Sequence, residues 1–163
     1  MEARARVTLG AALLRDPIRT VRLETVSSLV DVPRDVFPPD QLATLDQVIA
    51  DYRQAQGFNT DRAEAHVNLG AIDARLGRQA AAEGAYRTAM RLQPVFIPAY
   101  INLADLYRQQ GREDLVAQTL RAALQADPAH AAAYHALGLS LVRQQRLRDA
   151  IPELAQAVQL QPD

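Results

Sequence analysis

The sequence predicts an all-α protein, built as a helical-repeat solenoid of about nine helices. Shifting the chain by 34 residues aligns the segments 63–96, 97–130 and 131–163 without a gap. Ala, Leu, Gln and Arg dominate the composition, and these residues favour helices. A fixed period of this size is typical of stacked supersecondary units, each too small to bury its apolar face alone.

Residues 1–32 precede the periodic region, and their sequence pattern predicts a pair of helices. Asp16-Pro17 opens the second helix, with Pro17 in its first turn. Residues 2–15 would form its partner. The Asp-Pro…Val-Arg pattern resembles the second half of a HEAT-type repeat, so we expect a HEAT-like helical pair. The apolar face of the second helix comprises Val21, Leu23, Val26, Leu29 and Val30.

Residues 33–62 predict a proline-rich loop followed by one capping helix. Three prolines within residues 31–39 favour a loop, and residues 40–56 have the apolar spacing of a helix. Tyr52 stands 34 residues before Tyr86, which places this helix in phase with the second helix of a repeat. We expect it to pack on the array as a degenerate cap.

Each of the three segments in residues 63–163 contains two stretches with apolar residues at three- and four-residue spacing, which indicates two amphipathic helices. Gly77 and Gly111 fall between the two helices, where a positive φ is useful. Asp61 and Glu64 have the spacing of a capping box that opens the first segment. A proline follows the second helix each time, at Pro94, Pro128 and Pro162.

The three segments resemble the tetratricopeptide repeat. The family places Leu at position 7, a small residue at position 8, a large one at position 24, Ala at position 27 and Pro at position 32. The family also prefers an aromatic residue at position 11 and a small one at position 20, and Asp73 and Val116 depart from these two preferences. The resemblance implies a right-handed solenoid of stacked helix pairs. The matching residues are Leu69, Leu103 and Leu137; Gly70, Ala104 and Gly138; Tyr86, Leu120 and Leu154; Ala89, Ala123 and Ala157; and Pro94, Pro128 and Pro162.

Composition argues against several classes of function. The net charge is −1 and the sequence has no basic stripe, so we expect no nucleic-acid partner. Cysteine is absent, and no apolar run approaches the roughly 20 residues of a membrane span. The histidines, His66, His130 and His135, have no metal-ligand spacing, and no nucleophile stands beside a base. We therefore expect neither an enzyme nor a bound metal or cofactor.

The resemblance implies a concave groove lined by the first helix of each repeat. Asn68 and Asn102 share position 6 and resemble the asparagine ladder by which tetratricopeptide proteins hold a peptide backbone. An amide both donates and accepts hydrogen bonds, so it can pair with any extended peptide. The alternative is that both side chains are simply solvated.

Arginines at positions 12 and 13 extend the predicted groove, and His135 lies in it at position 5. These arginines could pair with an acidic or C-terminal carboxylate of a ligand. Equally, they could complement the C-terminal end of a helix dipole. A chaperone-type carboxylate clamp is disfavoured, because it requires basic residues at two positions that Val67 and Ala132 occupy here. The three arginines are Arg75, Arg108 and Arg143.

We therefore expect a protein-interaction module that binds an extended peptide in the groove. The alternative is a structural docking or oligomerisation domain of a larger protein: a glycosyltransferase, or a bacterial multihaem cytochrome-type repeat protein, whose C-terminal part the chain resembles. An excised domain of an exported protein would be periplasmic, and otherwise the chain would be cytoplasmic. We also expect the last helix to be uncovered, so that the chain either continues or self-associates through Ile151, Leu154, Val158 and Leu160.

Overall fold

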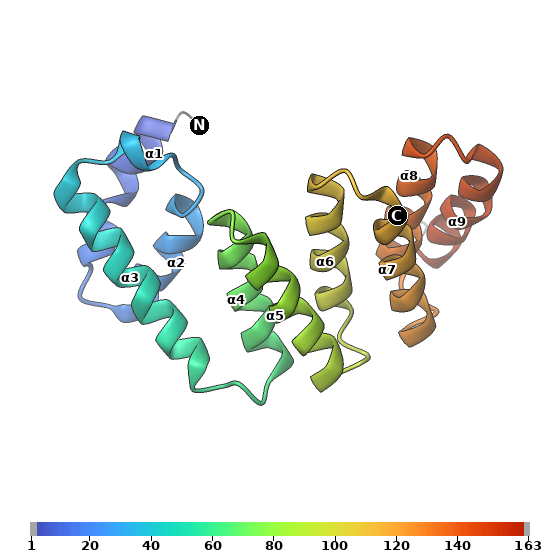
Figure 1. Ribbon diagram of the computed structural model, residues 1–163, viewed down its shortest axis with the longest axis horizontal. Coiled ribbons are helices and arrows are strands. Elements are labelled where there is room, and N and C mark those ends of the chain that lie inside the picture. Colours follow the sequence, from blue (N-terminus) through green and yellow to red (C-terminus); the bar gives the residue numbers. More distant parts are fainter. Residues whose placement is uncertain (1–2, 162–163) are drawn as a thin grey trace.

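The computed structural model describes residues 3–161, which form nine α-helices and two short 3-10 turns (Figure 1). The helices follow one another as antiparallel pairs along a curved row, with α1–α3 at one end and α8–α9 at the other. The predicted all-α solenoid of about nine helices is confirmed over this range. Pro162, which we expected to follow the last helix, lies outside the described residues.

The three repeats have identical helix boundaries in repeat numbering. The first helix covers positions 1–13 and the second covers positions 17–30, so the 34-residue period is also the structural period. The pairs are α4 (Ala63–Arg75) with α5 (Gln79–Leu92), α6 (Ile97–Gln109) with α7 (Glu113–Ala126), and α8 (Ala131–Arg143) with α9 (Leu147–Leu160).

The turn between the paired helices requires a left-handed residue at position 15. Gly77 has φ 72° and Gly111 has φ 70°, as predicted for the two glycines. The third repeat places Gln145 there, with φ 60°. Glycine adopts this conformation without steric cost, whereas a residue with a Cβ does not. The turn geometry is therefore set by the repeat and not by the residue present.

Small residues at position 8 let the paired helices approach closely. A Cβ added to Gly70 would lie 2.5 Å from the ring of Tyr86, and one added to Gly138 would lie 2.5 Å from Leu154. Tyr86 and Leu154 both occupy position 24. The small-residue position of one helix thus receives the large residue of its partner, as the sequence pattern predicted.

The N-terminal part contains three helices: α1 (Ala3–Gly10), α2 (Arg19–Leu29) and α3 (Pro39–Gly57). They enclose a core of their own that reaches α4 through Ile72, which is 3% exposed. The 3-10 turns Leu13–Arg15 and Arg34–Val36 lie in the connections. The helix α3 corresponds to the helix predicted over residues 40–56.

Three local predictions were wrong. The helix expected over residues 2–15 ends at Gly10, with Glu2 outside the described residues. Pro17 lies before the N-cap of α2, and Asp16 instead accepts a 2.8 Å hydrogen bond from the backbone N–H of Ile18 in a tight turn. Arg62 is the N-cap of α4, so Asp61 stands one residue too early for a capping box. Each error concerns a helix boundary, where a local turn competes with the helix.

The repeats share a second core centred on the middle pair. It includes Tyr86 from α5, Leu106 and Tyr107 from α6, Leu120 from α7 and Leu137 from α8. This core crosses both junctions between repeats, so each pair depends on its neighbours for burial. Within residues 3–161, no helix combines the length and apolar character needed to cross a membrane.

Candidate functional site

Two hollows follow the face formed by the first helices of the repeats. One, of about 160 Å³, lies between α4 and α6 and includes Asn102 and Arg75 in its lining. The next, of about 170 Å³, lies between α6 and α8 and includes Arg108 and Arg143. Asp105 lines both hollows. We call these two hollows together the first-helix groove.

The lining of the hollow between α6 and α8 combines apolar and charged residues. Ile101 and Ala104 of α6 and Leu139 of α8 supply apolar surface, while Arg108 and Arg143 stand at the rim. A small number of polar groups around apolar surface is the usual composition of a ligand site. The hollow could therefore hold an apolar side chain of a peptide beside a carboxylate.

The two asparagines predicted for the groove differ in position. Asn102 is half-buried, lines the hollow between α4 and α6, and donates from Nδ2 to the carbonyl of Pro98 at 2.8 Å. That bond uses one of its two amide hydrogens. Asn68 is exposed and lies near α3, with its Nδ2 3.5 Å from Oε1 of Gln56. Asn102 lines the groove, whereas Asn68 lies outside the lining of both hollows.

The three predicted arginines are each engaged within the chain. Arg75 donates to the carbonyl of Ser27, near the C-terminal end of α2. Arg108 pairs with Asp105 at 3.1 Å, and both side chains are about half exposed. Arg143 binds Glu113 through two nitrogens, at 2.6 and 3.2 Å. Among the three, Arg108 has the weakest constraint, because surface pairs contribute little and exchange readily.

The histidines take three different roles. His135 is exposed and lines both the groove and a further hollow at the α8–α9 end. His130 is the N-cap of α8, and its Nδ1 accepts the backbone N–H of Ala133 at 3.2 Å. His66, expected in a core position, is half-buried, and its Nε2 lies 2.9 Å from the carbonyl of Thr60. The hydroxyl of Tyr100, at the same repeat position, donates to Pro94 in the same way.

Carboxylates at the junctions between repeats were not predicted from the sequence. Glu113 of α7 accepts hydrogen bonds from Ser140, at 2.6 Å, and from Arg143 of α8. The guanidinium of Arg143 holds the pKa of Glu113 below its ordinary value, despite the opposing effect of burial. Glu83 of α5 similarly accepts the hydroxyl of Tyr107 of α6 at 3.0 Å. Because Glu83 and Glu113 occupy different repeat positions, periodicity gave no signal for them.

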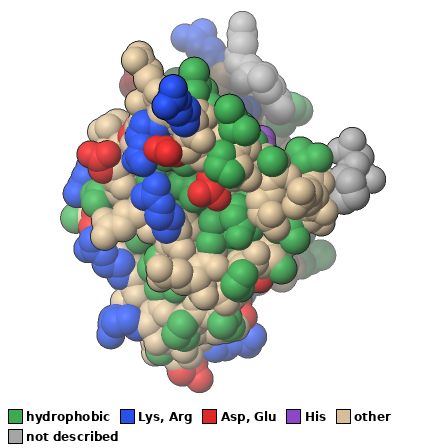
Figure 2. All heavy atoms as spheres, turned by 90° about the vertical axis from the view of Figure 1, so that its right-hand side faces the viewer, with side chains coloured by type: hydrophobic (Ala, Val, Ile, Leu, Met, Phe, Trp, Pro, Cys, Tyr) green, Lys and Arg blue, Asp and Glu red, His purple; other side chains and the backbone are tan. Residues whose placement is uncertain are grey.

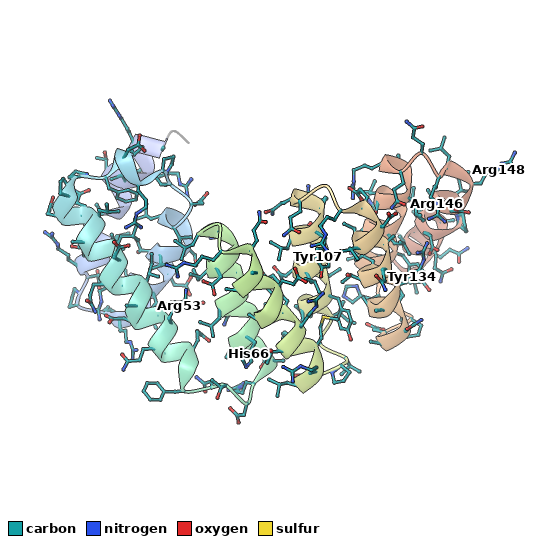
Figure 3. All side chains as sticks on the ribbon, viewed as in Figure 1. Arg53, His66, Tyr107, Tyr134, Arg146 and Arg148 are labelled. Atoms are coloured by element: carbon teal, nitrogen blue, oxygen red, sulfur yellow. The ribbon has the colours of Figure 1, made fainter. Side chains whose placement is uncertain are left out.

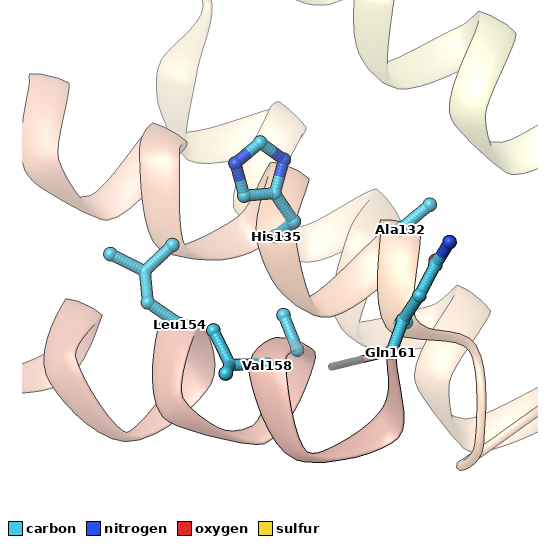
Figure 4. Close-up of a pocket in the computed structure, with 7 residues that line it drawn as sticks. Ala132, His135, Leu154, Val158 and Gln161 are labelled. Carbon is cyan, nitrogen blue, oxygen red and sulfur yellow. The ribbon is translucent and has the colours of Figure 1, made fainter. Parts of the chain in front are cut away.

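A third hollow lies at the end of the array, between α8 and α9 (Figure 4). It measures about 340 Å³, and its lining includes Ala132, His135, Leu154, Val158 and Gln161. The same position in the middle repeat is filled by α8, where Ala133 packs against Ile97 and Ala123. The end hollow is therefore the place where another helix would pack.

The part of the chain that the structure describes, residues 3–161, contains no group of three or more acidic, His or Cys side chains arranged to hold a metal ion. Charged side chains form ion pairs within and between helices, and Arg53, which takes part in one of them, is labelled in Figure 3. Arg53 of α3, for example, binds the buried Asp73 of α4 at 2.6 Å.

The last two helix pairs match a known repeat family. Residues 97–130 and 131–163 match the profile of the tetratricopeptide repeat family. These two segments are tetratricopeptide repeats. The pair α4–α5 has the same helix boundaries in repeat numbering, although the profile match begins at residue 97. No curated protein matches the chain in sequence.

Solved structures of MamA have a similar fold. The match to one of them covers 98% of this chain and 86% of the MamA chain, at 22% identity and a TM-score of 0.59. A second covers 98% and 92% at 19% identity and a TM-score of 0.61. A third, from Desulfovibrio magneticus RS-1, covers 98% and 76% at 19% identity and a TM-score of 0.53. At these identities the likeness concerns the fold alone.

Tetratricopeptide repeats support a protein-interaction or scaffold module, and they imply protein partners. The resemblances to a HEAT-type pair and to multihaem cytochrome-type proteins find no support in these matches. Both stay predictions from the sequence.

Proposed function

We propose that the chain binds an extended segment of another protein in the first-helix groove. The observation that carries this proposal is that two hollows flank α6, with Asp105 in the lining of both. An extended peptide rises about 3.3 Å per residue, so side chains a few residues apart can reach the hollows on the two sides of α6, which are separated by a helix roughly 10 Å wide. A single deep pocket would instead favour a small molecule.

The groove chemistry indicates which peptide would fit. The hollow between α6 and α8 offers Ile101 and Leu139 to an apolar side chain, with Arg108 at the rim for a carboxylate. Asn102 can offer its second amide hydrogen to a peptide carbonyl. We therefore propose a segment with apolar side chains flanked by acidic ones.

The experiment begins by selecting peptides from a displayed random library on the immobilised chain. Fluorescence anisotropy then gives the dissociation constant of the best peptide. The double variant Asn68→Ala, Asn102→Ala should weaken binding by about 1–3 kcal/mol through lost backbone pairing, with little change in helicity or melting temperature. An unaltered dissociation constant would remove the groove as the site.

A second variant separates charge recognition from backbone recognition. Arg108→Gln should weaken binding of an acidic peptide and reduce its salt dependence, because a rim charge acts mainly through long-range attraction. Asn59→Ala and Arg121→Gln, both at exposed positions outside the groove lining, are the matched controls and should leave binding unchanged.

Docking or oligomerisation is the second candidate function, and the uncovered hollow at the α8–α9 end favours it. This surface shares only His135 with the hollow between α6 and α8 and no residue with the hollow between α4 and α6. The two larger-protein contexts, a multihaem cytochrome-type protein and a glycosyltransferase, remain predictions from the sequence.

A further inference from the structure

The second helix of the last repeat exposes a row of large apolar side chains. Leu147, Ile151 and Val158 are 59%, 67% and 65% exposed, and the half-buried Leu154 lies between them. We call these four residues the α9 seam. Figure 2 looks onto this end of the molecule, where hydrophobic side chains gather between charged ones. Separations of four, three and four residues place all four on one face of the helix.

The preceding repeat shows how unusual this seam is. In the preceding repeat, Glu113 occupies the position of Leu147 and binds α8. Ala117 occupies the position of Ile151 and is 2% exposed. In the first repeat, Glu83 occupies the position of Ile151 and accepts a hydrogen bond from Tyr107. Thus each inner junction uses a carboxylate at one of these two positions to accept hydrogen bonds from the next helix.

This difference identifies the kind of helix that fits the end. A helix like α6 or α8 would bring a hydroxyl and, in the case of α8, an arginine to positions where Leu147 and Ile151 can accept no hydrogen bond. Burying such polar groups without partners is costly. The seam instead suits a helix whose own contacting face is apolar along its whole length.

The α9 helix of a second copy meets this requirement. The seam spacing reads the same in both directions, so two antiparallel copies can match around a two-fold axis between residues 152 and 153. Leu147 then meets Val158 of the second copy, and Ile151 meets Leu154 of the second copy. An isologous contact of this kind is the commonest form of protein dimer, and apolar residues at this spacing form helix–helix seams.

Charges at the edge of the seam are compatible with this pairing. Arg148, which points away from the array in Figure 3, lies beside the seam. In the antiparallel register it stands near Ala155 of the second copy, an exposed residue without charge. The two Arg148 side chains are offset by about 13 Å along the helix axis. Like charges therefore do not meet across the two-fold axis.

We propose that the chain forms a two-fold dimer through antiparallel pairing of the α9 seams. The pairing leaves the hollows between α4 and α6 and between α6 and α8 outside the contact. The dimer would therefore present two grooves, and a partner with two binding segments would gain from engaging both.

The first test replaces seam residues by those of the preceding repeat. Sedimentation equilibrium of the full chain should show a dimer. The double variant Leu147→Glu, Ile151→Ala should raise its dissociation constant by about tenfold or more, because each change counts twice in a two-fold contact. Helicity and melting of the monomer should be retained. Val95→Glu, which adds the same charge at an exposed apolar residue between α5 and α6, should leave the dimer intact.

The second test determines the register, and it benefits from a chain without cysteine. Mixing Leu147→Cys with Val158→Cys under mild oxidation should give a disulfide between the two variants. Leu147→Cys alone should give none, because the two copies of residue 147 are offset by about 16 Å along the axis.

A strictly monomeric wild-type chain would overturn the proposal, and so would a Leu147→Cys homodimer, which requires parallel pairing. Seam variants should leave peptide affinity per chain unchanged, while Asn68→Ala, Asn102→Ala should leave the dimer unchanged. Failure of groove binding and failure of the seam dimer are thus separate results.

Discussion

Glu113 joins two repeats through a single carboxylate. It stands in the first turn of α7 and accepts from Ser140 and Arg143 of α8, with its side chain 21% exposed. Hydrogen bonds to a charged acceptor are stronger than neutral ones. The same interaction stabilises the ionised form, so the pKa of Glu113 is lowered. One residue therefore links the stability of a junction to pH.

We expect Glu113→Gln to destabilise the chain by about 1–3 kcal/mol at pH 7. A folded-state pKa below the unfolded value gives stability that is present above the unfolded pKa and is lost as pH falls through the folded pKa. The difference between wild type and variant should therefore shrink as pH falls below about 4. Urea unfolding at pH 7 and pH 3 measures it.

The neighbouring Asp114→Asn is the control for this experiment, because Asp114 is exposed in the same helical turn. It should change stability by less than about 0.5 kcal/mol at either pH. If Glu113→Gln loses the same unfolding free energy at both pH values, then packing of the side chain, and not its charge, stabilises the junction.

Gln145 is held in a conformation that its two counterparts reach with glycine. Its φ of 60° costs a residue with a Cβ about 1–2 kcal/mol, while glycine loses somewhat more chain entropy on folding. We expect Gln145→Gly to stabilise the chain by about 0.5–1 kcal/mol in urea unfolding. The reverse change at Gly111, Gly111→Gln, should destabilise it by a similar amount, and a less stable Gln145→Gly would contradict the strain argument.

At the scale of the element, close packing of paired helices depends on position 8. Gly70 of α4 faces Tyr86 of α5, which is 2% exposed, and burial raises the pKa of Tyr86 to about 12. The ring is confined, so it cannot move aside at little cost. The close approach of α4 to α5 thus depends on the absence of a side chain at residue 70.

We expect Gly70→Ala to destabilise the chain by about 1–3 kcal/mol, because the added Cβ would overlap the ring. Gly84→Ala in α5 is a matched control, since a Cβ there meets nothing within 4 Å. That change should stabilise the helix by roughly 0.5–1 kcal/mol. Thermal unfolding of both variants gives the comparison, and equal effects would show that helix propensity alone governs both sites.

At the scale of the whole molecule, one buried charge connects the N-terminal helices to the repeats. Asp73 departs from the aromatic preference of position 11, and its side chain is 5% exposed. It pairs with Arg53 of α3 at 2.6 Å, and Arg78 lies 3.6 Å away. Arg75 adds a second link, to the carbonyl of Ser27 in α2. Asp73, which departs from the repeat pattern, thus lies where the repeats contact the N-terminal helices.

Replacing Asp73 by Ala should destabilise the chain by several kcal/mol at most, since Arg53 remains partly solvated and can regain water. A double-mutant cycle of Asp73→Ala with Arg53→Ala should give a coupling energy of about 1–3 kcal/mol. Hydrogen exchange in α1–α3 should accelerate before exchange in α6–α9. Uniform acceleration would mean that the pair stabilises the whole chain as one unit.

The helices of the repeats and their close pairing can be predicted from the sequence. Helix periodicity and the small and large residues at positions 8 and 24 act between neighbours in the chain, so they can be read in order. The binding partners of the long polar side chains, in contrast, follow only from how the helices stack. Arg75 reaches Ser27, which is 48 residues away, and Arg143 reaches Glu113, 30 residues away. A flexible side chain chooses among partners that only the stacking of helices brings within reach. Exposure of the α9 seam follows for the same reason, because burial depends on which helix covers it.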